Sequence, residues 1–203
     1  MRKKSHIALA SCLLTWLGNE ELDRYWKAFY FGSIQPDLNP KMFAEPHEFD
    51  ASWDKIRDRI RQIEAEANEE ETSRRVVWTH IGIVLHYLAD YFTFPHNTCY
   101  PGSLKDHCLY ENRMKYLMRA YLCTEEAQTV FEEQRGCSSG IRTAEQLFAC
   151  IEQMHRSYMH QAGHSELDDC RSIMQICACA CLVLARMACV EEPQVVWHGS
   201  CVA

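Results

Sequence analysis

Glycine and proline are scarce in this chain, with 8 glycines and 6 prolines among 203 residues. A fold of many short strands and tight turns needs more of both, so the shortage favours long helices. No stretch is long and apolar enough to predict a confident membrane span. Because 47% of the residues are hydrophobic, the chain is neither disordered nor membrane-embedded. We expect one domain, residues 1–192, that folds as an all-α multi-helix bundle and is followed by a tail, residues 193–203.

An excess of positive charge is also missing, since the formal net charge is −7 at pH 7. This balance argues against nonspecific binding to a nucleic acid backbone. The basic start from Met1 to Lys4, followed by the apolar run from Ile7 to Leu17, resembles a short signal peptide. His6 interrupts that pattern, however, and no A-x-A cleavage site follows. We therefore interpret the segment as the first helix of the domain and expect a cytoplasmic protein, with secretion as the alternative.

The chain contains 12 cysteines but no CxxC motif, so neither a Cys-zinc site nor a disulfide framework is indicated. Four of them lie in one apolar run that we predict to be a buried helix, where a two-residue spacing cannot pair them: Cys177, Cys179, Cys181 and Cys189. Buried, unpaired cysteines behave as small hydrophobic side chains and are typical of proteins in a reducing compartment.

Hydrophobic periodicity and capping signals predict helices along most of the chain. The predicted helices cover residues 3–17, 20–31, 49–71, 73–93, 104–122, 124–133, 143–160 and 165–189. The helix over residues 73–93 is apolar nearly all round and is expected to be central. Two prolines and an Asn-Pro step predict an irregular loop over residues 31–40, with Asp37 in its middle. A second loop, residues 94–103, carries His96.

Three histidines, together with the carboxylates of Asp90 and Glu111, fall in the short stretch from His86 to Glu111. His86 and Asp90 are four residues apart on an apolar helix, and His107 and Glu111 repeat the spacing on the next, so each pair shares a helix face. A charged carboxylate on an apolar helix is costly unless it is paired or binds a metal. Imidazole and carboxylate are zinc ligands, and helical folds build di-metal sites from such pairs. The pattern predicts a metal site; the alternative is a set of buried His–carboxylate pairs that tie helices together.

Other histidines receive a structural interpretation. His80 lies off the helix face of His86 and is expected to be a hydrogen-bonded residue of the core or its boundary. His155, His160 and His164 straddle a predicted helix end, where a second metal site is not favoured.

The order and spacing of the candidate residues resemble a known family. The matching features, in chain order, are Asp37 in a Pro-Asp loop, His47, the unit His86-x3-Asp90-x5-His96, and the unit His107-x3-Glu111. This order resembles the bacterial zinc-dependent phospholipase C family, which is structurally akin to the single-strand-specific S1/P1-type nucleases. The resemblance runs from His6 to Glu111 and implies an all-α bundle of the phospholipase C/P1 nuclease type.

The resemblance implies a cluster of zinc ions in a cleft. Carried over by position, the first zinc would be held by His47, His86 and Asp90 with Asp37 beside it, and the second by His96, His107 and Glu111. Asp90 would bridge to a third zinc, which His6 also binds. In the family the third zinc is completed by the amino group and carbonyl of an N-terminal tryptophan. This chain begins with Met1 and has no tryptophan before Trp16, so we expect two or three zinc ions.

The implied reaction is hydrolysis of a phosphate ester, most simply a phosphodiester. Zinc lowers the pKa of bound water to near 7 and neutralises charge on phosphate oxygens. Asp37 is the candidate to orient or deprotonate the attacking water. In choline-preferring members a tyrosine follows the loop aspartate, and an aromatic residue lies three before the loop histidine. Here these residues are Leu38 and Ala44, so a preference for phosphatidylcholine is not implied.

Two alternative functions stay open. The same metal cluster serves nucleases and nucleotidases, although the acidic charge and the lack of a basic, aromatic-rich stripe weigh against stable nucleic acid binding. The other alternative is a metal-stabilised helical module that binds without catalysis. We expect a small-molecule or lipid phosphodiester as substrate and at most peripheral membrane contact, and the oligomeric state is left open.

Overall fold

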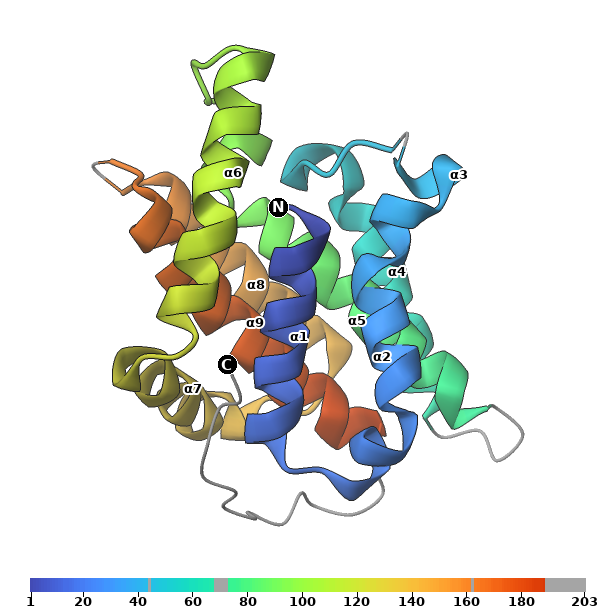
Figure 1. Cartoon of the computed structure of the whole chain (residues 1–203). Helices are drawn as coiled ribbons and strands as arrows, with labels where there is room; N and C mark the ends of the chain where they lie inside the picture. The colour runs from blue at the N-terminus through green and yellow to red at the C-terminus, as the bar shows by residue number, and fades with distance from the viewer. Residues whose placement is uncertain (44, 68–72, 162, 189–203) are drawn as a thin grey trace.

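The structure, a computed structural model, describes residues 1–43, 45–67, 73–161 and 163–188 (Figure 1). The described residues form helices joined by connecting segments, and none of them lies in a β-strand. The predicted all-α fold class is therefore confirmed. The predicted tail and Cys189 lie outside the described residues.

The elements follow one another in chain order. α1 spans Lys3–Leu17, α2 Glu20–Leu38, α3 Pro40–Phe43, α4 Phe49–Glu66, α5 Arg74–Tyr91, and the 3-10 turn η1 Phe94–His96. α6 spans Leu104–Tyr121, α7 Glu125–Cys137, the 3-10 turn η2 Ser138–Gly140, α8 Ala144–Met159, and α9 Glu166–Ala188. Each helix that the sequence predicts is present. α2 and α7 run further than predicted, α4 ends earlier, and α3 is additional.

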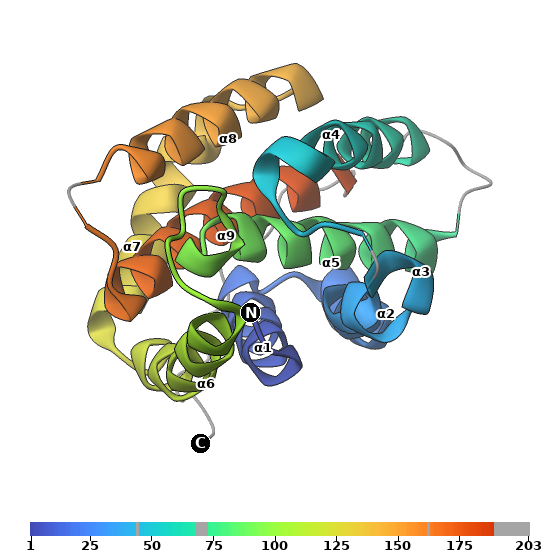
Figure 2. The ribbon, with the colours of Figure 1, turned by 90° about the horizontal axis from the view of Figure 1, so that it is seen from above.

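α5 and α9 lie side by side in the middle of the molecule (Figure 2). α1, α2 and α6 cover one face of this pair, and α4 and α8 cover the other. Every residue of α5 from Ile81 to Tyr91 is buried, so the prediction that this helix is central is confirmed. By length and composition, and contrary to the expectation from the sequence, one of the described helices, α9, is long and apolar enough to cross a membrane. Of that apolar stretch 78% is buried within the protein, which is the pattern of a core helix.

The prediction of an irregular loop over residues 31–40 is wrong, because α2 continues to Leu38 with Pro36 inside it. A proline removes one helical hydrogen bond and costs about 3 kcal/mol in a helix interior. Pro36 is buried, so packing of this part of α2 onto the core offsets that cost. As a consequence Asp37 lies in the last turn of a helix, which fixes its direction relative to α5.

Two glycines explain why α2 packs so closely on α5. A Cβ atom on Gly32 of α2 would lie 2.1 Å from the backbone oxygen of Thr79. A Cβ atom on Gly82 of α5 would lie 2.4 Å from the backbone oxygen of Phe29. The two helices therefore meet backbone to backbone, at a distance that no side chain would permit. This crossing lies next to the histidine and aspartate of α5 that the sequence singles out.

Helix ends follow the predicted capping signals. Thr143 and Gln146 form a capping box at the start of α8, and the side chain of Thr124 caps α7. Ser165 caps α9 in the same manner. Gly18 ends α1 in the left-handed conformation, with φ of 59°, which glycine adopts without a steric penalty.

Candidate metal centre

α5 places a histidine and an aspartate on one buried face. His86 and Asp90 lie one helical turn apart, and each is 1% exposed. The Nδ1–H of His86 donates to the backbone oxygen of Ser33 in α2 at 2.9 Å. This bond determines the tautomer and turns the Nε2 lone pair of His86 toward Asp90, whose Oδ2 lies 3.3 Å away.

His47 joins this pair from the segment between α3 and α4. Its Nδ1 lies 2.9 Å from Oδ2 of Asp90. One ligand atom from each of His47, His86 and Asp90 lies within 4.8 Å of the others. Asp37 lies beside them, with Oδ1 4.0 Å from Nε2 of His86. The structure thus brings together the residues that the resemblance assigns to one zinc.

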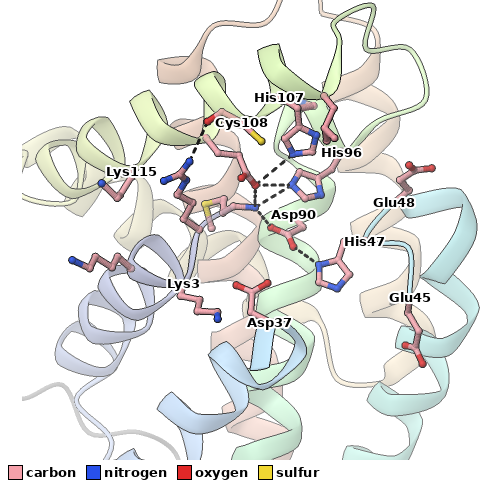
Figure 3. A pocket seen from close by; sticks show the side chains of 16 residues that line it. Lys3, Asp37, Glu45, His47, Glu48, Asp90, His96, His107, Cys108 and Lys115 are labelled. Carbon is pink, nitrogen blue, oxygen red and sulfur yellow. Dashed lines mark hydrogen bonds and ion pairs between the residues drawn. The ribbon is translucent and has the colours of Figure 1, made fainter. Parts of the chain in front are cut away.

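η1 and α6 supply a second group, made of His96, His107 and Glu111. Oε1 of Glu111 lies 3.3 Å from Nε2 of His96 and 3.5 Å from Nε2 of His107. Figure 3 shows both imidazoles close to Asp90, on the side away from Asp37. These three residues are the ones that the resemblance assigns to a second zinc.

His6 reaches the centre from α1. Its ring stacks on that of His86 with the centroids 3.8 Å apart, and its Nε2 lies 3.4 Å from Oδ1 of Asp90. His6 also forms a third possible ligand group with Asp37 and His86. Among side chains the resemblance pairs His6 with Asp90, whereas the structure places His6 within reach of Asp37 as well.

The amino group of Met1 is buried among the same side chains. It contacts Asp90, and it lies 3.1 Å from Nε2 of His96 and 3.3 Å from Oε1 of Glu111. Burial opposes the charge of this group, but the carboxylates of Asp90 and Glu111 raise its pKa. A positive charge therefore lies between the two carboxylates, which is the kind of neighbour that a metal cation would provide.

The residues present fit bound zinc. Nε2 of His6, His47 and His86 is buried without a hydrogen-bond partner among the described residues. His6 and His86 approach Asp90 at ion-pair distance but without hydrogen-bond geometry. A buried polar atom that lacks a partner costs about 1–3 kcal/mol. Imidazole nitrogens beside carboxylates are the usual donors for zinc, and an ion at this position would satisfy them.

The electrostatics of His6, His96 and Asp90 favour the protonation states that metal ligands need. Burial lowers the pKa of His6 to about 3, and the neighbouring His86 adds to this effect. Burial also lowers the pKa of His96, with the Met1 amino group acting in the same direction. At His47 burial also acts to lower the pKa, but the contact with Asp90 outweighs it and raises the pKa. Burial by itself would raise the pKa of Asp90, but the Met1 ammonium and nearby imidazoles hold this pKa well below its usual range. Neutral imidazoles and an ionised carboxylate are the forms that bind metal.

The ligand groups open into a cleft of about 760 Å³. Asp37, Asp90, His96, His107 and Glu111 all line it, together with His47 (Figure 3). This volume is in the range of small-molecule sites, roughly 300–1,000 Å³. A phosphate ester can therefore reach the candidate ligands from solvent.

A buried carboxylate that the sequence analysis does not single out supports the second ligand group. Asp169 of α9 is 0% exposed. It accepts hydrogen bonds from the Phe94 N–H (2.7 Å), the Tyr110 hydroxyl (2.8 Å) and the Tyr158 hydroxyl (2.7 Å). Phe94 begins η1, and Tyr110 directly precedes the candidate ligand Glu111 of α6. An acidic residue in the first turn of a helix is expected for the helix dipole alone, so the sequence signal for this role is weak.

Three of the remaining histidines serve structural contacts. Nδ1 of His80 lies 3.2 Å from Oε2 of Glu66, so the expected hydrogen bond is confirmed. His155 is buried, with Nε2 3.2 Å from Oδ1 of Asn97. His164 stacks on Phe94. The described part of the chain contains no metal-ligand group beyond the three around Asp90.

Comparison with known proteins gives one match. A family model described as zinc dependent phospholipase C matches residues 5–165, which is most of the chain and includes all eight candidate residues from His6 to Glu111. No curated protein and no solved structure matches the chain.

Proposed function

Because this chain belongs to the zinc-dependent phospholipase C family, we propose that it hydrolyses a phosphodiester bond. The substrate would most simply be a phospholipid, and the products diacylglycerol and a phosphorylated headgroup. One observation carries the proposal: two separate groups of imidazoles and carboxylates, from elements far apart in sequence, meet at the surface of one cleft.

The two groups would each hold one zinc ion. His47, His86 and Asp90 form one ligand set, and the other is formed by His96, His107 and Glu111. A third ion would be held by His6 and Asp90. Zinc in such sites lowers the pKa of water and neutralises charge that develops on phosphate oxygens.

Asp37 would act as the proton acceptor. Its carboxylate lines the cleft beside His86, and burial raises its pKa despite the opposing effect of His86. A raised pKa makes a carboxylate a better base near neutral pH. The water oxygen forms its bond to phosphorus as a proton passes to Oδ of Asp37, and the bond to the leaving alcohol oxygen breaks. The oxygen leaves as an alkoxide and takes up a proton from solvent, to which Asp37 in turn releases its own.

Metal stoichiometry tests the premise of this proposal. Inductively coupled plasma mass spectrometry, on protein purified without an affinity metal or chelator, should find two or three equivalents of zinc. His86→Ala should lower the zinc content, because His86 belongs to two of the ligand groups. His80→Ala, in the same helix but outside every group, should not. Less than one equivalent, unchanged in His86→Ala and not restored by added zinc, would contradict the metal centre.

Turnover of a generic phosphodiester tests the catalytic step. Asp37→Asn should lower turnover by roughly 100-fold or more while the zinc content is retained, because the amide accepts no proton. Unchanged turnover would exclude Asp37 as the base. If the zinc-loaded, unmutated protein shows no turnover, the catalytic proposal is contradicted and the alternative, a metal-stabilised helical module that binds without catalysis, is favoured. A comparison of phospholipid with single-stranded nucleic acid substrates separates a phospholipase from a nuclease.

A further inference from the structure

One side of the metal cleft is basic. Four cationic side chains line it and are here called the basic rim: Arg2, Lys3 and Lys4 at the start of α1, and Lys115 of α6. Figure 3 shows Lys3 and Lys115 on the side of the cleft opposite Glu45 and Glu48. Since the whole chain has a formal net charge of −7, the basic rim is a local reversal of the charge of the protein.

The basic rim has no carboxylate partner among the described residues. Arg2 donates to the backbone oxygen of Cys108 at 3.3 Å. The Lys115 ammonium lies 4.2 Å from the centre of the Tyr116 ring. Clustered cations that form no ion pair produce a local positive potential that attracts anions from solution, and the carboxylates Glu45 and Glu48 line the opposite side of the cleft. Because the cluster borders the candidate ligands, an anion drawn to it arrives at the metal centre.

Exposed apolar and aromatic side chains lie next to the basic rim. Leu104 lines the same cleft and is 80% exposed, and Tyr116, which follows Lys115, is 63% exposed. Leu104 begins α6, whose N-terminal end projects beyond the neighbouring helices in Figure 1. Lysines combined with exposed leucine and tyrosine are typical of surfaces that bind the headgroup region of an anionic bilayer.

Building on the proposed function, we propose that the basic rim docks the protein on an anionic phospholipid surface. The lysines and Arg2 contact the negative headgroups, and Leu104 enters the boundary between headgroups and acyl chains. Because the rim forms one side of the metal cleft, the same positive charge favours an anionic headgroup over choline, whose trimethylammonium group it repels. The substrate class of the cleft is therefore an anionic phospholipid presented by a bilayer.

Co-sedimentation of the full, zinc-loaded chain with vesicles tests this inference. One set of vesicles contains phosphatidylcholine alone, and the other contains phosphatidylcholine mixed with phosphatidylglycerol. The protein should bind the mixed vesicles at least roughly tenfold more tightly. Added salt should remove the difference, because ions screen exposed charges.

Two double variants with the same change of charge locate the effect. Lys3→Gln/Lys115→Gln removes two cations of the basic rim and should weaken binding to the mixed vesicles by roughly tenfold or more. Lys27→Gln/Lys41→Gln removes two exposed cations that do not line the cleft and should bind as the unmutated protein does. Zinc content, measured on each variant, verifies that the metal centre is intact.

Equal binding to the two kinds of vesicle, or the same loss in both double variants, would overturn the inference. Binding of a single-stranded oligonucleotide through Lys3 and Lys115, with no binding to vesicles, would overturn it in favour of nucleic acid. Co-sedimentation needs no turnover, so the two proposals fail separately. If the protein hydrolyses a phosphodiester with zinc but binds both kinds of vesicle equally, only the role of the basic rim is contradicted. If it binds anionic vesicles through the lysines but hydrolyses nothing, only the catalytic proposal is contradicted.

Discussion

Asp90 is the residue that joins the parts of the candidate metal centre. Its Oδ2 faces His47 and His86, and its Oδ1 faces His6 and the amino group of Met1. A buried carboxylate is costly unless cations and hydrogen bonds surround it, and here its two oxygens face four nitrogen groups. The position of Asp90 at the end of α5 therefore determines where a cation, such as a metal ion, would be bound in this centre.

Asp169 should contribute more to stability than any one of its hydrogen bonds. Asp169→Ala leaves the Phe94 N–H and two tyrosine hydroxyls without their acceptor, and each costs about 1–3 kcal/mol when buried. We expect a loss of at least about 3 kcal/mol in the free energy of unfolding, measured by urea denaturation. Tyr158→Phe removes one donor and leaves Asp169 two others, so it should cost about 1 kcal/mol. Equal losses in the two variants would contradict the role of Asp169.

His155 should make stability depend on pH in acid. Its ring is stacked on Phe49 with centroids 3.9 Å apart, and burial lowers its pKa to about 4. An unfolded histidine has a pKa of about 6.5, so the folded state binds fewer protons. The contribution of neutral His155 is therefore fully present above about pH 6.5 and is lost as the pH falls through about 4. The loss reaches about 3 kcal/mol.

The pH dependence can be isolated with one variant. Urea unfolding of the metal-free protein at several pH values should show stability falling between about pH 6.5 and 4. In His155→Gln, whose side chain does not titrate, this part of the fall should disappear. An identical pH profile for the two proteins would show that His155 is not the titrating group.

At the scale of elements, the crossing of α2 and α5 positions the metal centre. Ser33 of α2 accepts the hydrogen bond that orients His86, and Asp37 in the last turn of α2 lies beside the same ring. Both contacts depend on the close backbone approach at Gly32 and Gly82. A change in the distance between the two helices therefore alters packing and ligand geometry together.

Gly82→Ala should destabilise the protein, because its new Cβ would lie 2.4 Å from a backbone oxygen of α2 and the helices would have to separate. Overpacking of this kind costs about 1–3 kcal/mol. Gly136→Ala is the matched control, since a Cβ at this position in α7 meets no atom within 4 Å. The control should be neutral or stabilising by up to about 1 kcal/mol, because alanine favours helix. The unfolding temperatures of the two variants are measured by thermal denaturation, and equal temperatures would contradict the close crossing of α2 and α5.

At the scale of the whole molecule, the centre links α1, α2, α5, α6, η1 and the segment before α4. These elements come together only in the folded chain, so a metal that binds all of them binds the folded state alone. Binding energy then adds to the free energy of unfolding.

Removal of metal with EDTA should lower the unfolding temperature, and added zinc should restore it. Zinc at about 100 times its dissociation constant adds about 2.7 kcal/mol, which corresponds to roughly 5–10 °C for a chain of this size. Differential scanning calorimetry measures the shift. His80→Ala should keep the full shift and His86→Ala should lose most of it. A shift of the same size in both variants would place the stabilising metal elsewhere.

Helical periodicity and local spacing in the sequence were enough to predict most of the helices, several of their start points and the paired candidate ligands. The i, i+4 pairs His86–Asp90 and His107–Glu111 share a helix face wherever a helix forms, so their proximity follows from local geometry. Helix starts at Thr124, Thr143 and Ser165 are local as well, because a capping side chain bonds backbone only a few residues away. Such features depend on neighbours in the chain and are readable without the fold.

Only the tertiary structure decided the rest. Pro36 predicts a break in α2, yet burial of that turn against the core keeps the helix intact and directs Asp37 toward His86. The contacts of Asp169 with Phe94 and of the basic rim with the metal cleft join residues far apart in the sequence. No local propensity encodes these contacts, because they exist only when distant apolar faces pack and bring separate helices to a common position.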